Sequence, residues 1–544
     1  MRRRALFWCA FSLTVLSFTS AWAEEAVDLD MVTRIRAEGF ERSQVMETLS
    51  HLTEEIGSRL TGSPAMKEAN DWTRSQLEKW GLANARLEGY DFGRGWTFSR
   101  VSVRMLAPRE TQLSALPMAW TAATEGPVRG AAVRLDLADE KDLEEHKGKL
   151  AGKILLSTKP RDAEEPESEP DFRRHDAKGL EELESFEIRD RPPGEELRRN
   201  RVKRWKFRKA LVDFLLEEKV VAVVELSSRD HGLIRVGAGG SWDEEDPHGL
   251  PGVTMAAEHY NHLVRLLDDG QEVELEIDVA ARFHDGPTSY NTVAEIPGTD
   301  KRGEVVMLGA HLDSWHAGTG ATDNAAGVAV MMEAMRILKT LGVKPRRTLR
   351  IALWSGEEQG LLGSTAYVRE HFASRPASED PEQLKLPERI RDATWPLQLE
   401  PEHGKLAAYF NVDNGGGKIR GIYSEENAGV RPIFAAWLAP LHDLGADTVT
   451  LRRTGGTDHQ AFDRVGIPGF QFIQDPMDYT PRTHHTHVDT LDHVHKKDLM
   501  QASVVVATFA YHAAMRPEIL PRKPLPQEPP KKEEKKKEEA EPGA

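Results

Sequence analysis

The chain has 544 residues, a formal net charge of −16 from 72 basic and 88 acidic side chains, 39% hydrophobic residues and one cysteine. A single cysteine excludes an intramolecular disulfide framework and a cysteine-rich zinc knuckle. The acidic excess argues against nucleic acid as a partner, because phosphate neutralisation needs clustered Lys and Arg, and a chain this long is expected to divide into two or more domains.

The two ends of the chain differ in composition from the rest. Three arginines after Met1, a mostly apolar run of 13 residues at 6–18, and Ala21-Trp22-Ala23 follow the order of a secretory signal peptide. The run is shorter than the roughly 20 residues that span a bilayer. We therefore expect residues 1–23 to be cleaved on export to the periplasm or the exterior, with no stable membrane insertion afterwards. Residues 521–544 are rich in Pro, Lys and Glu without apolar periodicity, which predicts a disordered tail.

The first half of the remaining chain changes texture near residue 118. Residues 24–117 contain apolar pairs at helical spacing and are predicted to be the N-terminal helical part of the main domain. Residues 118–285 consist of short β-type runs and end in a period-two strand at 273–279, which predicts a small β-rich domain inserted into the larger one. A very charged stretch near 159–206 interrupts this region, and we expect a solvated insertion there.

Residues 286–520 alternate between strand and helix patterns. Apolar strand runs are expected at 305–308, 349–354 and 406–412, with helices over 325–341 and 361–372. This alternation predicts an α/β fold with a mixed, largely parallel central sheet flanked by helices. Ligands bind beyond the carboxyl ends of the strands in such sheets, so the residues after each run are the candidates for chemistry.

Potential metal ligands follow each of the three strand runs, and a histidine cluster comes late in the chain. Each motif alone is weak evidence, but their common position after strands makes coincidence hard to sustain. Together they form a mixed nitrogen and oxygen set that suits zinc. The candidates are His311 and Asp313 in HLDS, Asp323 in GATDNAAG, Glu357 and Glu358 in SGEEQG, Asp413 in NVD, and His484, His485 and His487 in THHTHVDT.

The ordered series HLDS, GATDNAAG, SGEEQGLLGS, NVD and HTHVDT resembles metallopeptidase family twenty-eight, the co-catalytic di-zinc exopeptidases of the bacterial leucyl aminopeptidase and plasma glutamate carboxypeptidase type. The similarity covers residues 289–515 and extends to the early segment EIGSRLTGS at 55–63. The middle region resembles the protease-associated domain that is often inserted in this family. The resemblance implies the zinc exopeptidase fold and two zinc ions per chain.

Carried over residue by residue, the resemblance makes His311 and Asp413 ligands of one zinc and Glu358 and His485 ligands of the other, with Asp323 bridging both. It implies that Glu357 is the general base for a metal-bridging hydroxide. Adjacent residues of an extended chain project in opposite directions, which agrees with separate roles for the two glutamates.

Two positions in this set depend on further reasoning. Asp313 lies two residues from His311, on the same side of an extended segment, and is expected to orient the imidazole. His484, His485 and His487 compete for the last ligand position, and the choice of His485 rests on the family's His-Thr-x-x-Asp-Thr spacing.

We expect a secreted zinc-dependent exopeptidase that hydrolyses peptides. Among the exopeptidase types, an aminopeptidase is the leading hypothesis. A carboxypeptidase or dipeptidase on the same metal core, a single-metal glutaminyl cyclase and a non-catalytic receptor on this fold are the alternatives. The segment GGTDHQ, with Asp458 and His459, is either a border of the substrate pocket or a polar turn. Serine-hydrolase, thermolysin-type and P-loop motifs do not occur in the sequence, and the oligomeric state is not predicted.

Overall fold

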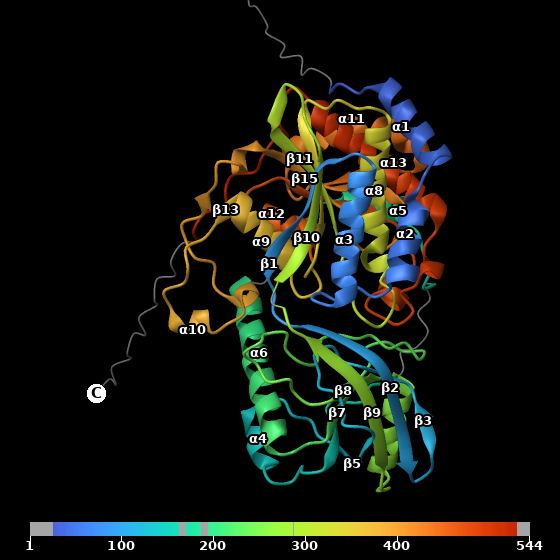
Figure 1. Cartoon of the computed structure of the whole chain (residues 1–544), viewed down its shortest axis with the longest axis vertical. Helices are drawn as coiled ribbons and strands as arrows, with labels where there is room; N and C mark the ends of the chain where they lie inside the picture. The colour runs from blue at the N-terminus through green and yellow to red at the C-terminus, as the bar shows by residue number, and fades with distance from the viewer. Residues whose placement is uncertain (1–24, 163–169, 187–193, 287, 530–544) are drawn as a thin grey trace, which may run out of the picture.

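The computed structural model describes residues 25–162, 170–186, 194–286 and 288–529, which form two bodies, each built on an eight-stranded sheet (Figure 1). The predicted signal peptide and residues 530–544 of the predicted tail lie outside the described residues. Within the described ranges, no helix combines the length and apolar character needed to cross a membrane.

The sheet of the upper body in Figure 1 is mixed, as predicted. Its four central strands, β12, β11, β15 and β18, run parallel to one another, while β1, β10 and β16 pair with their neighbours toward the centre in antiparallel fashion. The strands in spatial order are β1 (Ala83–Asp91), β10 (Thr288–Ile296), β12 (Arg347–Trp354), β11 (Lys301–His311), β15 (Leu406–Asn411), β18 (Gly469–Gln474), β16 (Ile419–Tyr423) and β17 (Thr448–Thr450).

Helices cover both faces of this sheet, which explains why its strands are apolar without alternation. Along β11, Leu308 and Ala310 pack into the core on one face, and Val305 and Met307 pack into the core on the other. The first face is covered by α1 (Leu29–Glu41), α2 (Val45–Ser50), α3 (Pro64–Lys79), α8 (Ala326–Thr340), α11 (Arg431–Leu438) and α13 (Lys496–Met515), and the second by α9 (Leu362–His371) and α12 (His459–Asp463).

The lower body contains the second sheet, in which β5, β6, β7 and β8 are parallel and the other pairs antiparallel. Helix α7 (Ala257–Asp268) packs on it. The strands in spatial order are β3 (Thr111–Leu113), β2 (Gly95–Ala107), β9 (Glu274–His284), β5 (Val128–Arg134), β6 (Lys153–Leu156), β7 (Ala222–Leu226), β8 (Gly252–Met255) and β4 (Ala115–Pro117).

Residues 83–117 differ from the helical structure predicted for 24–117, because they form strands β1 to β4. Three of these strands pair into the second sheet, so the predicted boundary at 117/118 falls inside it. The sequence signal for these strands lies in β2, where Val103 and Met105 are two residues apart and both buried. This period-two pattern was obscured by the apolar pairs at helical spacing upstream.

The charged stretch near 159–206 is not simply solvated. Its described parts include α5 (Ala177–Glu184) and α6 (Gly194–Glu217). Before α5, Arg174 donates to Asp475 Oδ2 at 3.0 Å and to Asp498 Oδ2 at 2.6 Å, and both acceptors are buried in the upper body. This segment is therefore bound to the upper body through ion pairs between a partly exposed arginine and two buried carboxylates.

The start of the predicted tail also contacts the upper body. Asn427 Nδ2 donates to the carbonyl of Pro521 at 2.7 Å, and Arg522 donates to the carbonyl of His403 at 3.1 Å. The expectation of disorder from residue 521 onward is therefore wrong for these first residues, because their backbone and side chains find specific partners.

Candidate metal centre

The predicted ligands meet at the carboxyl edge of the parallel strands. His311 is the last residue of β11, Asp413 follows β15, and Glu357 and Glu358 occupy the turn after β12. Asp323 lies in the helical turn Ala321–Ala325 before α8. The strand-end rule thus places four of the candidate side chains at one edge of the sheet.

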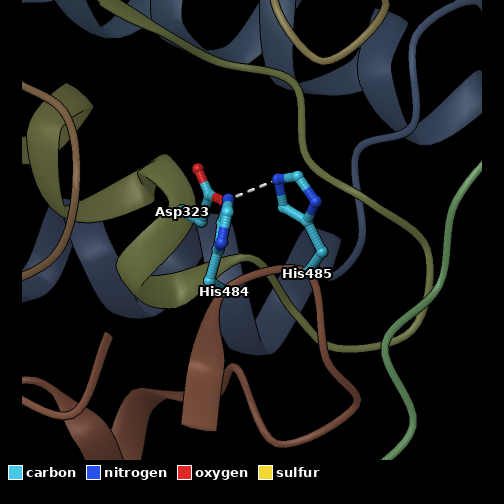
Figure 2. A group of neighbouring side chains, drawn as sticks. All are labelled: Asp323, His484 and His485. Atoms are coloured by element: carbon cyan, nitrogen blue, oxygen red, sulfur yellow. Dashed lines mark ion pairs between the residues drawn. The ribbon is translucent and has the colours of Figure 1, made fainter. Parts of the chain in front are cut away.

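The ligand atoms face one another across short distances. His311 Nε2 lies 3.2 Å from Asp323 Oδ1 and 3.4 Å from Asp413 Oδ1. His485 Nε2 lies 3.4 Å from Asp323 Oδ2 and 3.0 Å from Glu358 Oε2. Figure 2 shows the ring of His485 turned toward the Asp323 carboxylate. The two oxygens of Asp323 therefore face two separate groups of candidate ligands.

The choice among the three histidines can be narrowed by position. His484 and His485 each place a ring nitrogen within 4.8 Å of an Asp323 oxygen (Figure 2). His487 is in neither of the two metal-compatible clusters among the described residues. Its Nδ1 instead accepts from the backbone N–H of Ile234 at 3.2 Å, which links the histidine loop to the lower body.

The imidazole of His311 is oriented by a backbone carbonyl. Its Nδ1 lies 3.0 Å from the carbonyl oxygen of Asp313 and 3.6 Å from the Asp313 carboxylate. Because a carbonyl only accepts, Nδ1 carries a hydrogen, and Nε2 is the ring nitrogen that faces Asp323 and Asp413 and is available to a metal. The Asp313 carboxylate, which was predicted to orient the ring, lies farther from Nδ1 than the main-chain carbonyl of the same residue.

The Asp313 carboxylate instead positions the turn that carries both glutamates. It accepts from the backbone N–H of Glu357 at 3.3 Å and of Glu358 at 3.2 Å. Thr61 donates to its Oδ2 at 3.0 Å and accepts from the N–H of Gly356 at 3.1 Å. One buried carboxylate and one hydroxyl thereby fix the geometry of the turn.

The Asp489 carboxylate fixes the backbone at Asp323 in the same way. Its Oδ1 accepts from the N–H and the hydroxyl of Thr322, both at 2.7 Å, and its Oδ2 accepts from the N–H of Asp323 at 3.1 Å. Burial, and then the nearby charge of Asp323, raise the pKa of Asp489 to about 7. Its position in HTHVDT was part of the family spacing, but no role was predicted for it.

Arg59 is another residue that the sequence did not single out. Its fully buried guanidinium donates to five backbone carbonyls, those of Leu52, Gly57, Leu312, Thr319 and Gly320, at 3.2, 2.7, 2.7, 2.8 and 2.9 Å respectively. Two of these carbonyls lie at residues 52–57, and the other three lie in the loops beside His311 and Asp323. Arg59 therefore holds together the loops that present the ligands.

Negative charge accumulates at this edge of the sheet. Burial raises the pKa of Glu357 and Glu358 well above the usual range, and neighbouring carboxylates add to both shifts. Burial acts to lower the pKa of His311, but the charge of Asp413 and hydrogen bonding to Asp313 and Asp323 raise it well above the usual value. The field at His311 Nε2 therefore favours a positive charge.

The buried ligand atoms fit a metal cation. Asp323 Oδ2 and Glu358 Oε1 are buried and receive no hydrogen bond from any described residue. Unpaired carboxylate oxygens are costly to bury, and metal coordination is one of the few arrangements that compensates for the cost. Imidazole nitrogen and carboxylate oxygen are also the ligand types that zinc accepts.

The segment with Asp458 and His459 contributes one residue to this environment. Asp458 is buried and accepts from the Ser364 hydroxyl at 2.5 Å, and burial raises its pKa to about 7. Its charge is among the causes that raise the pKa of Glu357, the candidate base. His459 instead lies with its Nε2 3.5 Å from Glu425 Oε1.

Comparisons with known proteins agree with this geometry. The model of peptidase family M28 matches residues 291–510. The chain is 26% identical to carboxypeptidase Q of Bos taurus over 488 residues, which cover 89% of this chain and 88% of that protein. It is 27% identical to aminopeptidase YwaD of Bacillus subtilis over 254 residues, 46% of this chain and 50% of that one.

Solved structures show the same fold. A peptidase M28 precursor from Shewanella amazonensis matches with a TM-score of 0.65 and 26% identity, covering 92% of this chain and 99% of that one. BSAP, a zinc aminopeptidase from Bacillus subtilis, matches with a TM-score of 0.54 and 20% identity over 87% and 94% of the two chains.

The α/β fold with a buried histidine and carboxylate cluster at its strand ends defines a metallopeptidase. Residues 291–510 match peptidase family M28, and relatives named carboxypeptidase Q match nearly the whole chain. The predicted family and fold class are confirmed.

Proposed function

We propose that the chain is a zinc-dependent exopeptidase that holds two ions. His311 and Asp413 would bind one zinc, Glu358 and His485 the other, and Asp323 both. One observation carries this division: Asp323 Oδ1 faces His311 at 3.2 Å, whereas its Oδ2 faces His485 at 3.4 Å. A carboxylate whose oxygens address two different ligand groups is the arrangement expected of a bridging ligand.

Bound zinc would supply Lewis acidity that polarises the scissile carbonyl and makes an attacking water more acidic. Glu357 is the proposed base that takes the proton from this water and delivers it to the departing amine. Asp313 and Thr61 keep its turn in place.

Aminopeptidase activity remains the first specific proposal, and BSAP and YwaD, named as aminopeptidases, support it. Carboxypeptidase or dipeptidase activity is the second. It is favoured by the relatives named carboxypeptidase Q, which match across nearly the whole chain, whereas YwaD matches less than half of it. We also propose that the lower body is a protease-associated domain and that the protein is exported.

The test combines metal content with a panel of peptides. The purified chain should bind zinc, lose activity in a chelator and regain it when zinc is restored. Free, N-blocked and C-blocked peptides then separate the exopeptidase types, since an aminopeptidase tolerates a blocked carboxyl end and a carboxypeptidase a blocked amino end. Glu357→Gln should keep its zinc and lose turnover. A chain without metal that hydrolyses none of the peptides would instead favour a receptor on this fold.

A further inference from the structure

We propose that the groove between α4 (Glu140–Glu145) and α6 is a docking surface for membranes that contain anionic phospholipid. The inference goes beyond the proposed peptidase function, because the residues that carry it lie on or beside these two helices and none belongs to the metal centre. Binding would be peripheral: basic side chains would hold lipid phosphates at the membrane surface, without a segment that crosses the bilayer.

Positive charge is concentrated on α6, although the chain is acidic overall. Residues 198–209 include eight arginines and lysines and no aspartate or glutamate, whereas the whole chain has a net charge of −16. Basic clusters of this kind on a surface helix are typical of proteins that bind anionic lipid. Figure 1 shows α6 along the outer edge of the lower body, with α4 beside its lower end. The cluster is therefore in a position to meet a flat, extended partner.

Part of this charge is not neutralised within the fold. Arg198 pairs with Asp392 at 2.7 Å. Arg199 and Lys203, in contrast, are exposed and form no ion pair with any residue that the structure describes. These two residues are four apart on one helix, so their like charges repel each other. An anion bound between them would relieve this repulsion.

The groove itself combines cationic and apolar side chains. It has a volume of about 550 Å³ and is lined by five basic and two acidic residues, together with Ala138, Val202 and Phe207. One of the two acids, Asp139, is already engaged as the N-cap of α4, where its Oδ1 accepts from the N–H of Lys141 at 2.9 Å. The lining therefore has an excess of positive charge next to apolar surface.

The apolar residues favour lipid over a soluble polyanion. The phosphates of duplex DNA are bound by charged and polar donors, and an apolar lining adds little to that interaction. A phospholipid joins an anionic head to hydrocarbon, which matches both parts of the groove. Trp205, three residues after Val202 and only partly buried, is of the type that lies at the boundary between membrane and water.

The test is cosedimentation of the full chain with vesicles of phosphatidylcholine alone, or of phosphatidylcholine mixed with phosphatidylglycerol. We expect tighter binding to the mixed vesicles, and the double variant Arg199→Gln/Lys203→Gln should weaken it about 10- to 30-fold. Lys79→Gln/Lys344→Gln removes the same charge from exposed positions of the upper body and should bind like the wild type. Any contribution from the apolar run at 6–18 is common to all these chains.

Equal binding to the two kinds of vesicle, or undiminished binding of Arg199→Gln/Lys203→Gln, would overturn the assignment. Tighter binding to duplex DNA than to the mixed vesicles would also overturn it, in favour of a soluble polyanion. If this variant does not fold, the wild type is measured at rising salt, where binding that is insensitive to screening would exclude the basic surface. Zinc content and peptide hydrolysis should be unchanged in both double variants, so failure of the proposed function is read separately.

Discussion

Replacing Arg59 by methionine tests whether one buried side chain holds the ligand loops together. The guanidinium is fully buried and makes its five hydrogen bonds to main-chain carbonyls. Burial lowers its pKa to about 10, and the charges of Asp489, Asp313 and Asp323 oppose that shift, so it stays charged at neutral pH. Methionine fills similar volume and donates no hydrogen bond.

The magnitude follows from the carbonyls left behind. Each buried carbonyl without a donor costs about 1–3 kcal/mol. Methionine avoids burying a charge, and relaxation and water recover part of the loss, so we expect a net fall in unfolding free energy of about 3–5 kcal/mol. Arg59→Lys keeps the charge but has three donors for these five acceptors, and should cost about 1–3 kcal/mol.

The assay is urea unfolding of the metal-free chain, followed by zinc titration of the folded variant. Zinc affinity should fall with stability, because Leu312 and Gly320 adjoin the loops that carry His311 and Asp323. Arg74→Met, which removes a surface pair with Glu78, is the control and should change stability by less than about 1 kcal/mol. An Arg59→Met chain as stable as this control would show that the guanidinium does not hold the ligand loops together.

Three further substitutions test separate parts of the structure. Thr61→Val should lower kcat about 10- to 100-fold at unchanged zinc content, and Thr61→Ser should restore it; a fully active valine variant would contradict the role of the hydroxyl. Burial acts to raise the pKa of Glu38, but hydrogen bonds led by that of Arg336 hold it below its usual value of 4.5. Glu38→Gln should therefore lower unfolding free energy by about 1–3 kcal/mol at pH 7, with a penalty that shrinks as pH falls below 4.5, and a penalty independent of pH would exclude this linkage. His487→Asn should retain two zincs by elemental analysis and His485→Asn should lose at least one; the reverse result would exchange their roles.

Much of the candidate site could be predicted because its residues follow strands. His311, Glu357, Glu358 and Asp413 come directly after apolar runs whose carboxyl ends must meet at one sheet edge. Asp323 was found through the family motif. Local sequence thus predicts which side chains can reach the site wherever the topology itself brings them together.

The supporting residues were missed because their partners are remote in the sequence. Thr61 and Asp313 are 252 residues apart. No periodicity or turn pattern records such a contact. Spacing alone also does not distinguish the side-chain oxygens of Asp313 from its carbonyl, which is the nearer acceptor for His311 Nδ1.

The early strands were missed for a different reason. Strand β2 contributes to a sheet that it shares with β9, almost two hundred residues later in the chain, and only part of its length is fully buried. A strand with such a mixed burial pattern gives a weak period-two signal.

Asp323 is proposed to hold two zinc ions between two groups of ligands. Elemental analysis of the zinc-loaded chain measures this directly, with Glu357→Gln and Asp323→Ala as its comparison variants. We expect two zincs in the wild type and in Glu357→Gln, with turnover lost in the latter, and loss of zinc in Asp323→Ala. Two zincs retained by Asp323→Ala, or no more than one in the saturated wild type, would contradict it.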